Sequence, residues 1–240
     1  MSVNRIAVAG RKGGVGKTTI SCGISSVYAH QKQHVLVVDL DPQSNVAFAL
    51  GGDPTKPGTA ELLTGKNPAP LVINEYLSVL PGGAELGSQA IQSAHAEDLA
   101  DAVRELPYDV MVFDCPPGNE HLERLALFAA QSVLIVANAH PMAIMGAGRV
   151  HSELTSSRKK GRNSATRWAI VQSLIDRRRK LDKNLEAVLQ DLYPDVENLI
   201  VHQDTEMANA TANQIPIMEF APNCRGAKDL QAIAVWGQHG

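Results

Sequence analysis

Glycines, lysines and hydroxyl groups are concentrated in one short segment near the start of the chain, residues 11–19, with the sequence RKGGVGKTT. Glycines let the backbone turn so that successive N–H groups point at one place, and a helix that begins there adds the positive end of its dipole. Such a segment predicts a phosphate-binding loop, in which Lys17 reaches the β- and γ-phosphates of a nucleotide and the Thr18 hydroxyl binds Mg²⁺. The residues expected to contact the nucleotide are Lys12, Gly13, Gly14, Val15, Gly16, Lys17, Thr18 and Thr19.

The segment departs from the usual phosphate-loop pattern G-x-x-x-x-G-K-[ST] at one position. The first glycine of that pattern falls on Arg11, and a glycine lies one place earlier, at Gly10. The alternative interpretation is a glycine-rich turn that binds nothing, but such a turn has no need for Gly-Lys-Thr-Thr directly before a helix. Phosphate binding is therefore the favoured interpretation.

Two aspartates mark the end of the next apolar run. Residues 34–39, HVLVVD, are almost continuously apolar and β-branched, which suits a strand buried on both faces. Asp39 and Asp41 lie at its carboxyl end, where open α/β sheets bind their ligands. The alternative is a pair of solvated turn carboxylates. Their position at the ligand end of a strand favours a role in a binding site.

A third aspartate ends another apolar run, residues 108–114. A hydrophobic strand that ends in one carboxylate is the Walker B arrangement, in which the carboxylate binds Mg²⁺ directly or through water. Such a strand is common by chance, but here it accompanies two other matching segments. Pro116 and Pro117 cannot continue a sheet, so we expect the chain to leave the sheet directly after Asp114 and to form a mobile segment.

Apolar runs and helical periodicity alternate along the chain, which predicts an α/β fold with a mostly parallel, twisted sheet and helices on both faces. The phosphate-loop motif places this expected fold in the P-loop NTPase type. The chain has 240 residues, 44% of them hydrophobic, and no linker-like segment, so we expect one domain over residues 1–240. The predicted strands are residues 3–9, 34–39, 76–80, 108–114, 132–137, 168–175 and 199–201. The predicted helices are residues 17–31, 59–63, 84–106, 144–156, 182–192 and 226–236.

Composition excludes several classes of protein. Because a short apolar run leads directly from residues 1–8 into the phosphate loop, we expect no secretory signal. No stretch approaches the roughly 18 uninterrupted apolar residues of a membrane span. Three scattered cysteines, Cys22, Cys115 and Cys224, are too few for a disulfide framework or a metal-binding C-x-x-C pair. We expect buried or half-buried thiols in a reducing, cytoplasmic environment.

Positive charge is concentrated in residues 149–183, which hold eleven lysines and arginines and three acidic residues, a net charge of +8, whereas the rest of the chain carries −11. This asymmetry predicts a surface that binds a polyanion. Two clusters flank the strand expected at 168–175, and we expect them to line one surface that contacts the phosphates of double-stranded DNA without sequence preference. The alternative is charge that serves solubility alone. The clusters are Arg158, Lys159 and Lys160, with Arg162 nearby, and Arg177, Arg178, Arg179 and Lys180.

Three of these segments together resemble the ParA/MinD family of ATPases, whose Walker A motif carries an additional lysine. They are KGGVGKTT at residues 12–19, VDLDPQ at 38–43 and DCPP at 114–117, and they occur in the family order at plausible spacings. Residues 215–217 and 226–228 add a weaker likeness. The resemblance extends over most of the chain.

The resemblance implies a mechanism. Such proteins bind MgATP as a sandwich homodimer, in which the signature lysine, here Lys12, crosses to the partner's phosphates while Lys17 serves its own nucleotide. Asp41 would position or polarise the attacking water, and Asp39 would support the metal and the switch segment. Hydrolysis would be slow and stimulated by a partner protein. The implied catalytic residues are Lys12, Lys17 and Asp41, and the implied metal-site residues are Thr18, Asp39 and Asp114.

Further features bear on the branch of the family and on the contacts with the nucleotide. Residues 231–240 hold no lysine or arginine, which argues against the basic membrane-binding helix of MinD-type members. The cysteines do not form the pairs that iron–sulfur relatives need, and we expect no N-terminal helix-turn-helix because the first strand starts so early. Residues 201–204 read VHQD where relatives often have an I-P-R-N-like stretch that contacts the base. His140, at the ligand end of the sheet, is expected to be a loop residue rather than a nucleotide contact.

Three functional hypotheses follow. The leading one is a cytoplasmic, nucleoid-associated ATPase that cycles between an ATP-bound, DNA-binding dimer and a released state, and thereby segregates a plasmid, a chromosome region or another cargo. The second is a regulatory or scaffolding ATPase that recruits a protein partner at a membrane, a secretion or conjugation apparatus or a polysaccharide synthase. The third is a biosynthetic enzyme that transfers a phosphoryl group to a small substrate.

Overall fold

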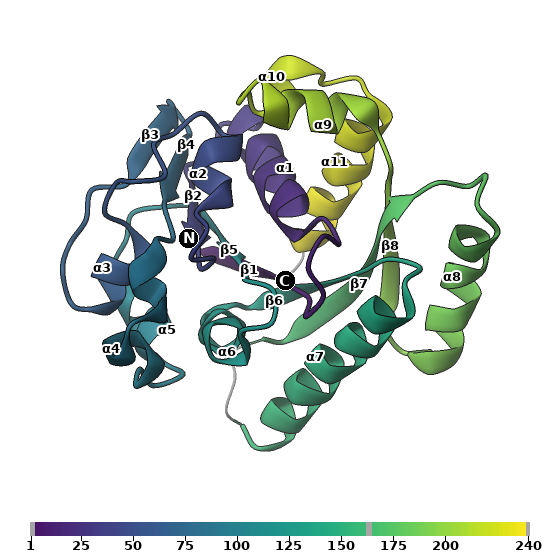
Figure 1. Ribbon diagram of the computed structural model, residues 1–240, viewed down its shortest axis with the longest axis horizontal. Helices are drawn as coiled ribbons and strands as arrows, with labels where there is room; N and C mark the ends of the chain where they lie inside the picture. Colours follow the sequence, from purple (N-terminus) through teal and green to yellow (C-terminus); the bar gives the residue numbers. More distant parts are fainter. Residues whose placement is uncertain (1–2, 162–164, 239–240) are drawn as a thin grey trace.

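The computed structural model describes residues 3–161 and 165–238, and within these ranges eight strands form one sheet (Figure 1). The strand order is β3-β4-β2-β5-β1-β6-β7-β8, and every neighbouring pair is parallel except β3 with β4. The strands are β1 (Asn4–Ala9), β2 (Val35–Asp39), β3 (Leu71–Asn74), β4 (Leu77–Leu80), β5 (Val110–Asp114), β6 (Ser132–Ala137), β7 (Arg167–Ile175) and β8 (Glu197–His202).

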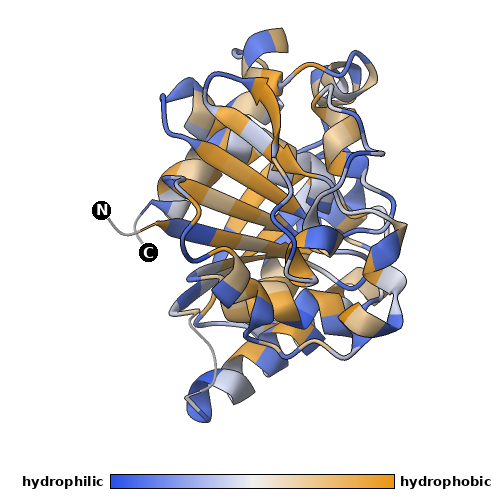
Figure 2. Ribbon diagram, turned by 90° about the vertical axis from the view of Figure 1, so that its left-hand side faces the viewer, coloured by the Kyte–Doolittle hydropathy of each residue, from blue (hydrophilic) through white to orange (hydrophobic). Residues whose placement is uncertain are grey.

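The central strands are buried on both faces, as their apolar sequences require. Every residue of β2, β5 and β6 is buried, and Figure 2 shows the strands as a hydrophobic layer between the helices. Side chains alternate along β1, so that Ile6 and Val8 join the core on one face of the sheet and Ala7 and Ala9 join the core on the other.

Helices cover both faces of the sheet. One face packs against α1 (Lys17–His30), α2 (Asn45–Ala49), α9 (Thr205–Ala212), α10 (Ile217–Phe220) and α11 (Arg225–Gly237). The other packs against the 3₁₀ turn η1 (Ala84–Gly87) and α3 (Thr59–Leu63), α4 (Gln89–Gln92), α5 (Asp98–Ala102), α6 (Glu120–Ala129), α7 (Pro141–Lys159) and α8 (Lys180–Leu192). The predicted fold class is therefore confirmed. Among the described residues, no helix has the length and apolar character needed to cross a membrane.

The single helix predicted over residues 84–106 is wrong. The structure has η1, α4 and α5 there, because local polar groups end each helical piece. Ser88 adopts an extended backbone between η1 and α4, and the carboxylate of Asp98 accepts a hydrogen bond from the backbone N–H of His95. Short polar side chains that bond to nearby backbone in this way compete with helix formation.

The helices α6 and α9, beside the site, are among those that were not expected from the sequence. Both begin at a capping side chain: Asn119 accepts hydrogen bonds from the first turn of α6, and Asp204 accepts one from the N–H of Glu206 in α9. An Asn or Asp directly before a segment with helically spaced apolar residues is the sequence signal for the start of a helix. Both helices matter below, because they border the phosphate loop.

Candidate active site

The phosphate loop connects the end of β1 at Ala9 to the start of α1 at Lys17. Gly14 and Gly16 have φ angles of 72° and 89°, in the left-handed region that favours glycine, which explains why these two positions lack side chains. No side chain caps the N-terminus of α1, and its first turn holds no acidic residue. The positive end of this helix is therefore available to an anion.

The two lysines of the loop differ in burial and in their relation to the cavity in front of the loop. Lys17 is only 6% exposed, lines the cavity in front of the loop, and places its Nζ 3.4 Å from the backbone oxygen of Lys12. Lys12 is exposed, its Nζ lies near the backbone oxygen of Gly13, and it is not among the residues that line the cavity. One molecule therefore offers a single lysine to a nucleotide bound in its own loop.

Asp114, the Walker B carboxylate, joins β5 to the first turns of α1. Its Oδ2 accepts a hydrogen bond from the Thr18 hydroxyl at 2.7 Å, and its Oδ1 accepts one from the Ser21 hydroxyl at 2.7 Å. The motifs do not include Ser21, although its spacing of three residues from Thr18 places both hydroxyls on one side of the helix. A hydroxyl and a carboxylate that meet beside a phosphate site supply the oxygen ligands that Mg²⁺ prefers, so Thr18 and Asp114 fit this ion.

Asp39 and Asp41 have different surroundings. The carboxylate of Asp39 is fully buried, and its two oxygens accept hydrogen bonds from the backbone N–H groups of Asp41 and Val46 at 2.8 and 3.1 Å. Both oxygens are engaged, which argues against Asp39 as a direct metal ligand and for its expected support of the switch segment. Asp41 lines the cavity, and one of its oxygens accepts from the N–H of Gln43 at 3.0 Å.

Two of these carboxylates lie side by side beneath the loop, since Asp39 and Asp114 are paired across β2 and β5. Burial, and then the neighbouring charge of Asp114, raises the pKa of Asp39 well above its usual value. Burial also raises the pKa of Asp114 to about 6, although hydrogen bonds from Ser21 and Thr18 and the charge of Lys17 act in the opposite direction. A cation at this position offsets the cost of ionising both groups. Among the described residues no cluster of three or more His, Cys, Asp or Glu side chains could hold a metal alone.

Two cavities meet at the loop and share Gly16, Thr19 and Thr211. The first, of about 440 Å³, lies against the loop and the carboxylates, and the second, of about 450 Å³, lies between β7, β8 and α9. The walls of the second cavity are mainly apolar, which suits the flat base of a nucleotide. Its lining includes residues 201–204, the stretch that corresponds to the base-contacting segment of relatives. The first is lined by Gly14, Gly16, Lys17, Thr18, Thr19, Asp41, Asn45, Phe48, Ala49, Pro117 and Thr211. The second is lined by Gly16, Thr19, Ile20, Ser173, Leu174, Val201, His202, Gln203, Asp204, Thr205, Met207, Ala208 and Thr211.

Sequence motifs do not identify the wall that β7 provides. A bulge between Gln172 and Ile175 turns Leu174 outward with a φ of 58°, a left-handed conformation that is costly for a leucine. Ser173 lies so close to the loop that a Cβ on Gly16 would be 2.8 Å from its Oγ. Nothing in the local sequence indicates this bulge.

The two basic clusters lie at opposite ends of β7 (Figure 1). Residues 158–160 are at the end of α7, near the start of β7, whereas residues 177–180 follow its end, on the edge of the sheet that holds the phosphate loop. At about 3.3 Å per residue, a strand of this length separates them by on the order of 26 Å. The expectation that both clusters line one surface is therefore wrong. Arg162 lies outside the described residues.

The second cluster contacts the wall of the cavity between β7, β8 and α9. Arg177 Nε donates to Nε2 of His202, whose Nδ1 lies 2.8 Å from Oδ2 of Asp229. Arg178 pairs with Asp176 at 2.9 Å, and this contact lowers the pKa of Asp176 to about 2. All four basic side chains of this cluster are exposed.

His140 and the three cysteines also have surroundings that the structure describes. His140 is exposed, caps α7 by accepting a hydrogen bond from the N–H of Met142, and does not line either cavity. Cys22 and Cys115 are buried and Cys224 is half-buried, and all three are free. Burial raises the pKa of the first two thiols well above the usual value, so they remain protonated at neutral pH.

Comparisons with known proteins agree with this geometry. The family model described as an AAA domain (AAA_31) matches residues 3–167. The chromosome-partitioning ATPase Soj of Thermus thermophilus is 31% identical over 236 residues, which cover 97% of this chain and 94% of that protein. The septum site-determining protein MinD of Pyrococcus horikoshii, solved with Mg-ADP, has the same fold, with a TM-score of 0.81 at 22% identity and coverage of 97% of this chain and 95% of the other.

Cobyrinic acid a,c-diamide synthase of Mycobacterium smegmatis, solved with ADP and magnesium, also superposes on 98% of this chain and 93% of its own, with a TM-score of 0.81 at 25% identity. This fold thus serves biosynthetic enzymes as well as positioning ATPases. The matched motifs, the family model and the Soj relative nevertheless agree on one assignment. The chain belongs to the ParA/MinD family of P-loop ATPases.

Proposed function

We propose that this protein is an ATP-dependent switch that positions or segregates a cargo such as a plasmid or a chromosome region. ATP binding joins two copies, the dimer binds double-stranded DNA without sequence preference, and slow hydrolysis, stimulated by a cargo-bound partner protein, releases it. Membership of the ParA/MinD ATPase family supports the ATPase activity. The name of the Thermus relative, a chromosome-partitioning ATPase, supports the positioning role.

The observation that carries the proposal is the separation of the two lysines. Lys17 is buried in the cavity, whereas Lys12, five residues earlier in the same loop, is exposed and does not line that cavity. A lysine that lies outside the nucleotide site of its own molecule can stabilise phosphate charge only in the site of a second molecule that approaches it. This supports a dimer in which Lys12 acts on the partner's nucleotide.

Each remaining group has a chemical role in this proposal. Lys17 and the loop N–H groups bind the β- and γ-phosphates, and the base occupies the apolar cavity beside β7. Thr18 and Asp114 hold Mg²⁺, which neutralises phosphate charge. Asp41 orients the attacking water and accepts its proton, and Asp39 fixes the segment that carries Asp41.

Replacing Lys12 with alanine tests the dimer directly. Because Lys12 does not line its own cavity, we expect ADP affinity to stay within about twofold of the native protein, while turnover falls by about a hundredfold, the usual loss when one charge-stabilising group is removed. Light scattering after size-exclusion chromatography, with no nucleotide, ADP or ATP, measures the assembly. The native protein should form dimers with ATP, but not with ADP or without nucleotide. Normal turnover by the variant would instead favour the biosynthetic hypothesis.

The location of the second basic cluster supports DNA binding that depends on the nucleotide. Residues 177–180 are exposed on the same edge of the sheet as the phosphate loop, and Arg177 contacts His202 in the wall of the base cavity. Charged groups on this edge can therefore respond to the nucleotide state. A cytoplasmic protein with this surface would associate with the nucleoid through phosphate contacts. We retain residues 158–160, at the end of α7 and near the opposite end of β7, as a second candidate contact.

A triple variant tests the DNA contact. Changing Arg177, Arg178 and Arg179 to alanine should weaken retention on duplex DNA with ATP at low salt, and should lower the slope of log affinity against log salt by about 3, one for each lost phosphate contact. Alanine at Arg158, Lys159 and Lys160 is the matched control from the other cluster. Loss of retention in the control alone would move the interface to the end of α7, and retention in both variants would contradict DNA binding through these clusters.

A second candidate function is recruitment of a protein partner. Leu181, Val188 and Leu192 are exposed by 70%, 40% and 54%, and their spacing places them along one side of α8. An apolar helix face of this kind can bind a partner. ATP-dependent sedimentation with lipid vesicles, without retention on DNA, would favour this scaffolding function over DNA segregation.

A further inference from the structure

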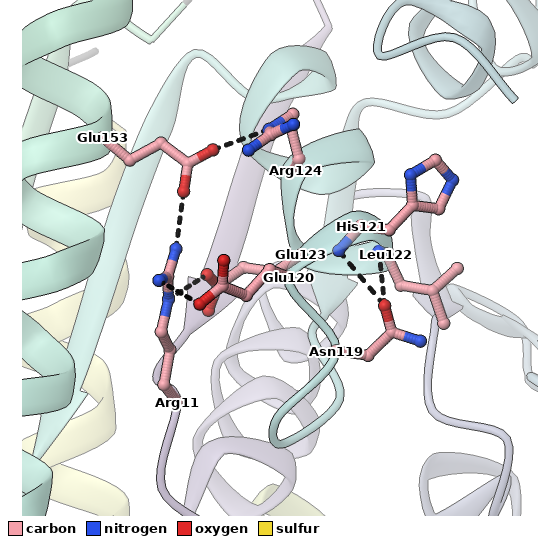
Figure 3. A network of polar contacts seen from close by, with 8 residues as sticks. All are labelled: Arg11, Asn119, Glu120, His121, Leu122, Glu123, Arg124 and Glu153. Carbon is pink, nitrogen blue, oxygen red and sulfur yellow. Dashed lines mark hydrogen bonds and ion pairs between the residues drawn. The ribbon is translucent and has the colours of Figure 1, made fainter. Parts of the chain in front are cut away.

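Arg11 occupies the position in the phosphate loop where the usual pattern has a glycine, and its guanidinium contacts three carboxylates (Figure 3). Nη1 lies 2.6 Å from Glu120, Nε lies 2.9 Å from Glu123, and Nη2 lies 2.6 Å from Glu153. The Arg11 side chain is 13% exposed and that of Glu123 only 2%. All three nitrogens of one guanidinium are thus engaged, and of the three carboxylates only Glu120, whose side chain is 56% exposed, is open to solvent.

The carboxylates come from two helices that flank the loop. Glu120 and Glu123 lie in the first turn of α6, and Glu153 lies in α7, where its second oxygen accepts a hydrogen bond from Arg124 of α6 at 2.8 Å. The network therefore ties the phosphate loop to α6 and α7, and ties these helices to each other (Figure 3).

The backbone around Arg11 is confined as well. A Cβ placed on Gly146 of α7 would lie 3.4 Å from the Cβ of Arg11, so the helix packs directly against this residue. A Cβ placed on Gly13 would lie 3.7 Å from the Cβ of Pro117, in the segment that connects Asp114 to α6. Helix α7 thus packs against the residue before Lys12, and Pro117 lies close to the residue after it.

We propose that Arg11 is a positioning residue, which fixes the direction in which Lys12 leaves the phosphate loop. This inference rests on the proposed function, in which Lys12 acts on a partner's nucleotide. Glu120 begins α6 just after the Pro-Pro segment that follows the metal-site carboxylate, so a movement of that segment is passed through the carboxylates to Arg11 and to its neighbour Lys12. Lys17 binds its own nucleotide independently of this network.

The glutamine variant Arg11→Gln tests the proposal, because it keeps a polar side chain but removes the charge and the three ion pairs. We expect ADP affinity within about twofold of the native protein, and a turnover number lowered by about ten- to a hundredfold with little change in KM for ATP, as for a misplaced catalytic group. The decisive measurement is a double-mutant cycle. Arg11→Gln combined with Lys12→Ala should be no slower than Lys12→Ala alone.

Matched variants separate positioning from folding. Arg124→Gln removes the other cation on Glu153 without changing the loop, and should leave turnover unchanged. If Arg11→Gln does not fold, the double variant Glu120→Gln and Glu153→Gln keeps the charged Arg11 on its buried partner Glu123 and reduces its other two ion pairs to weaker hydrogen bonds with neutral amides. It should lower turnover in the same direction, again only when Lys12 is present.

The outcomes distinguish this inference from the function on which it rests. If Lys12→Ala lowers turnover and Arg11→Gln does not, or if their effects multiply, Arg11 has no positioning role and the dimer proposal stands. If Lys12→Ala leaves both turnover and dimerisation unchanged, the dimer proposal fails and the role of Arg11 fails with it. A loss of turnover in Arg11→Gln that disappears in the Lys12→Ala background supports both.

Discussion

Replacing Lys17 with alanine is expected to abolish nucleotide binding. Lys17 is the only lysine among the residues that line the cavity in front of the loop, within the described part of the chain, and it is almost fully buried there. A charge-assisted hydrogen bond to phosphate in such a site contributes about 3 kcal/mol, so affinity for ADP should fall by at least about a hundredfold. Isothermal titration calorimetry with ADP and Mg²⁺ measures the change.

The matched control for this variant is Lys66→Ala, which removes an exposed lysine from a loop outside both cavities. Its ADP affinity should equal that of the native protein. Because Lys17 also donates to the backbone oxygen of Lys12, circular dichroism should establish that the Lys17 variant is folded. An affinity within tenfold of the native value in a folded Lys17→Ala protein would show that the loop amides alone bind the phosphates.

Replacing Asp41 with alanine is expected to preserve nucleotide binding and dimerisation but to suppress hydrolysis. Asp41 lines the same cavity as Lys17 and Thr18, and it has one oxygen that is not engaged by the N–H of Gln43. A group that orients water and accepts its proton contributes about a hundredfold to ten-thousandfold to a rate, so turnover should fall by at least a hundredfold. Phosphate release under single-turnover conditions measures the chemical step.

The Asp41→Asn variant separates the charge of Asp41 from its structural contact. An asparagine can still accept the hydrogen bond from the N–H of Gln43 and thus keeps the turn, but it cannot accept a proton. Both variants should accumulate the ATP-bound dimer, because release follows hydrolysis. Normal turnover by the asparagine variant would assign Asp41 to the geometry of the segment instead of to the activation of water.

The central part of the site could be predicted because its signals are local. Gly14, Gly16 and Lys17 are close together in sequence, and Asp39 and Asp114 end apolar strands whose parallel packing brings their carboxyl ends to one edge. The alternation of strands and helices then places the loop and the carboxylates together. A parallel sheet leaves little freedom in where such residues meet.

The rest of the site depends on contacts between distant segments. Arg11 pairs with residues 109 to 142 positions away, and neither α6 nor α7 carries a motif that indicates such a partner. The base cavity depends on the bulge at Leu174, which is a property of the paired strands and not of β7 alone. The resemblance assigned Asp39 to the metal site. Only the structure shows that both of its carboxylate oxygens accept hydrogen bonds from backbone N–H groups.

The place of β1 in the sheet has a consequence for how the protein is made. β1 lies between β5 and β6, so that Asn4 pairs with Val110 and Ile6 pairs with Ser132. Parallel pairing over such sequence separations forms slowly, because a long loop must close before any contact is gained. On the ribosome, the strand that leads into the phosphate loop remains without neighbours until β5 and β6 have emerged. ATP therefore stabilises this protein only in the late stages of folding, after more than half of the chain has been synthesised.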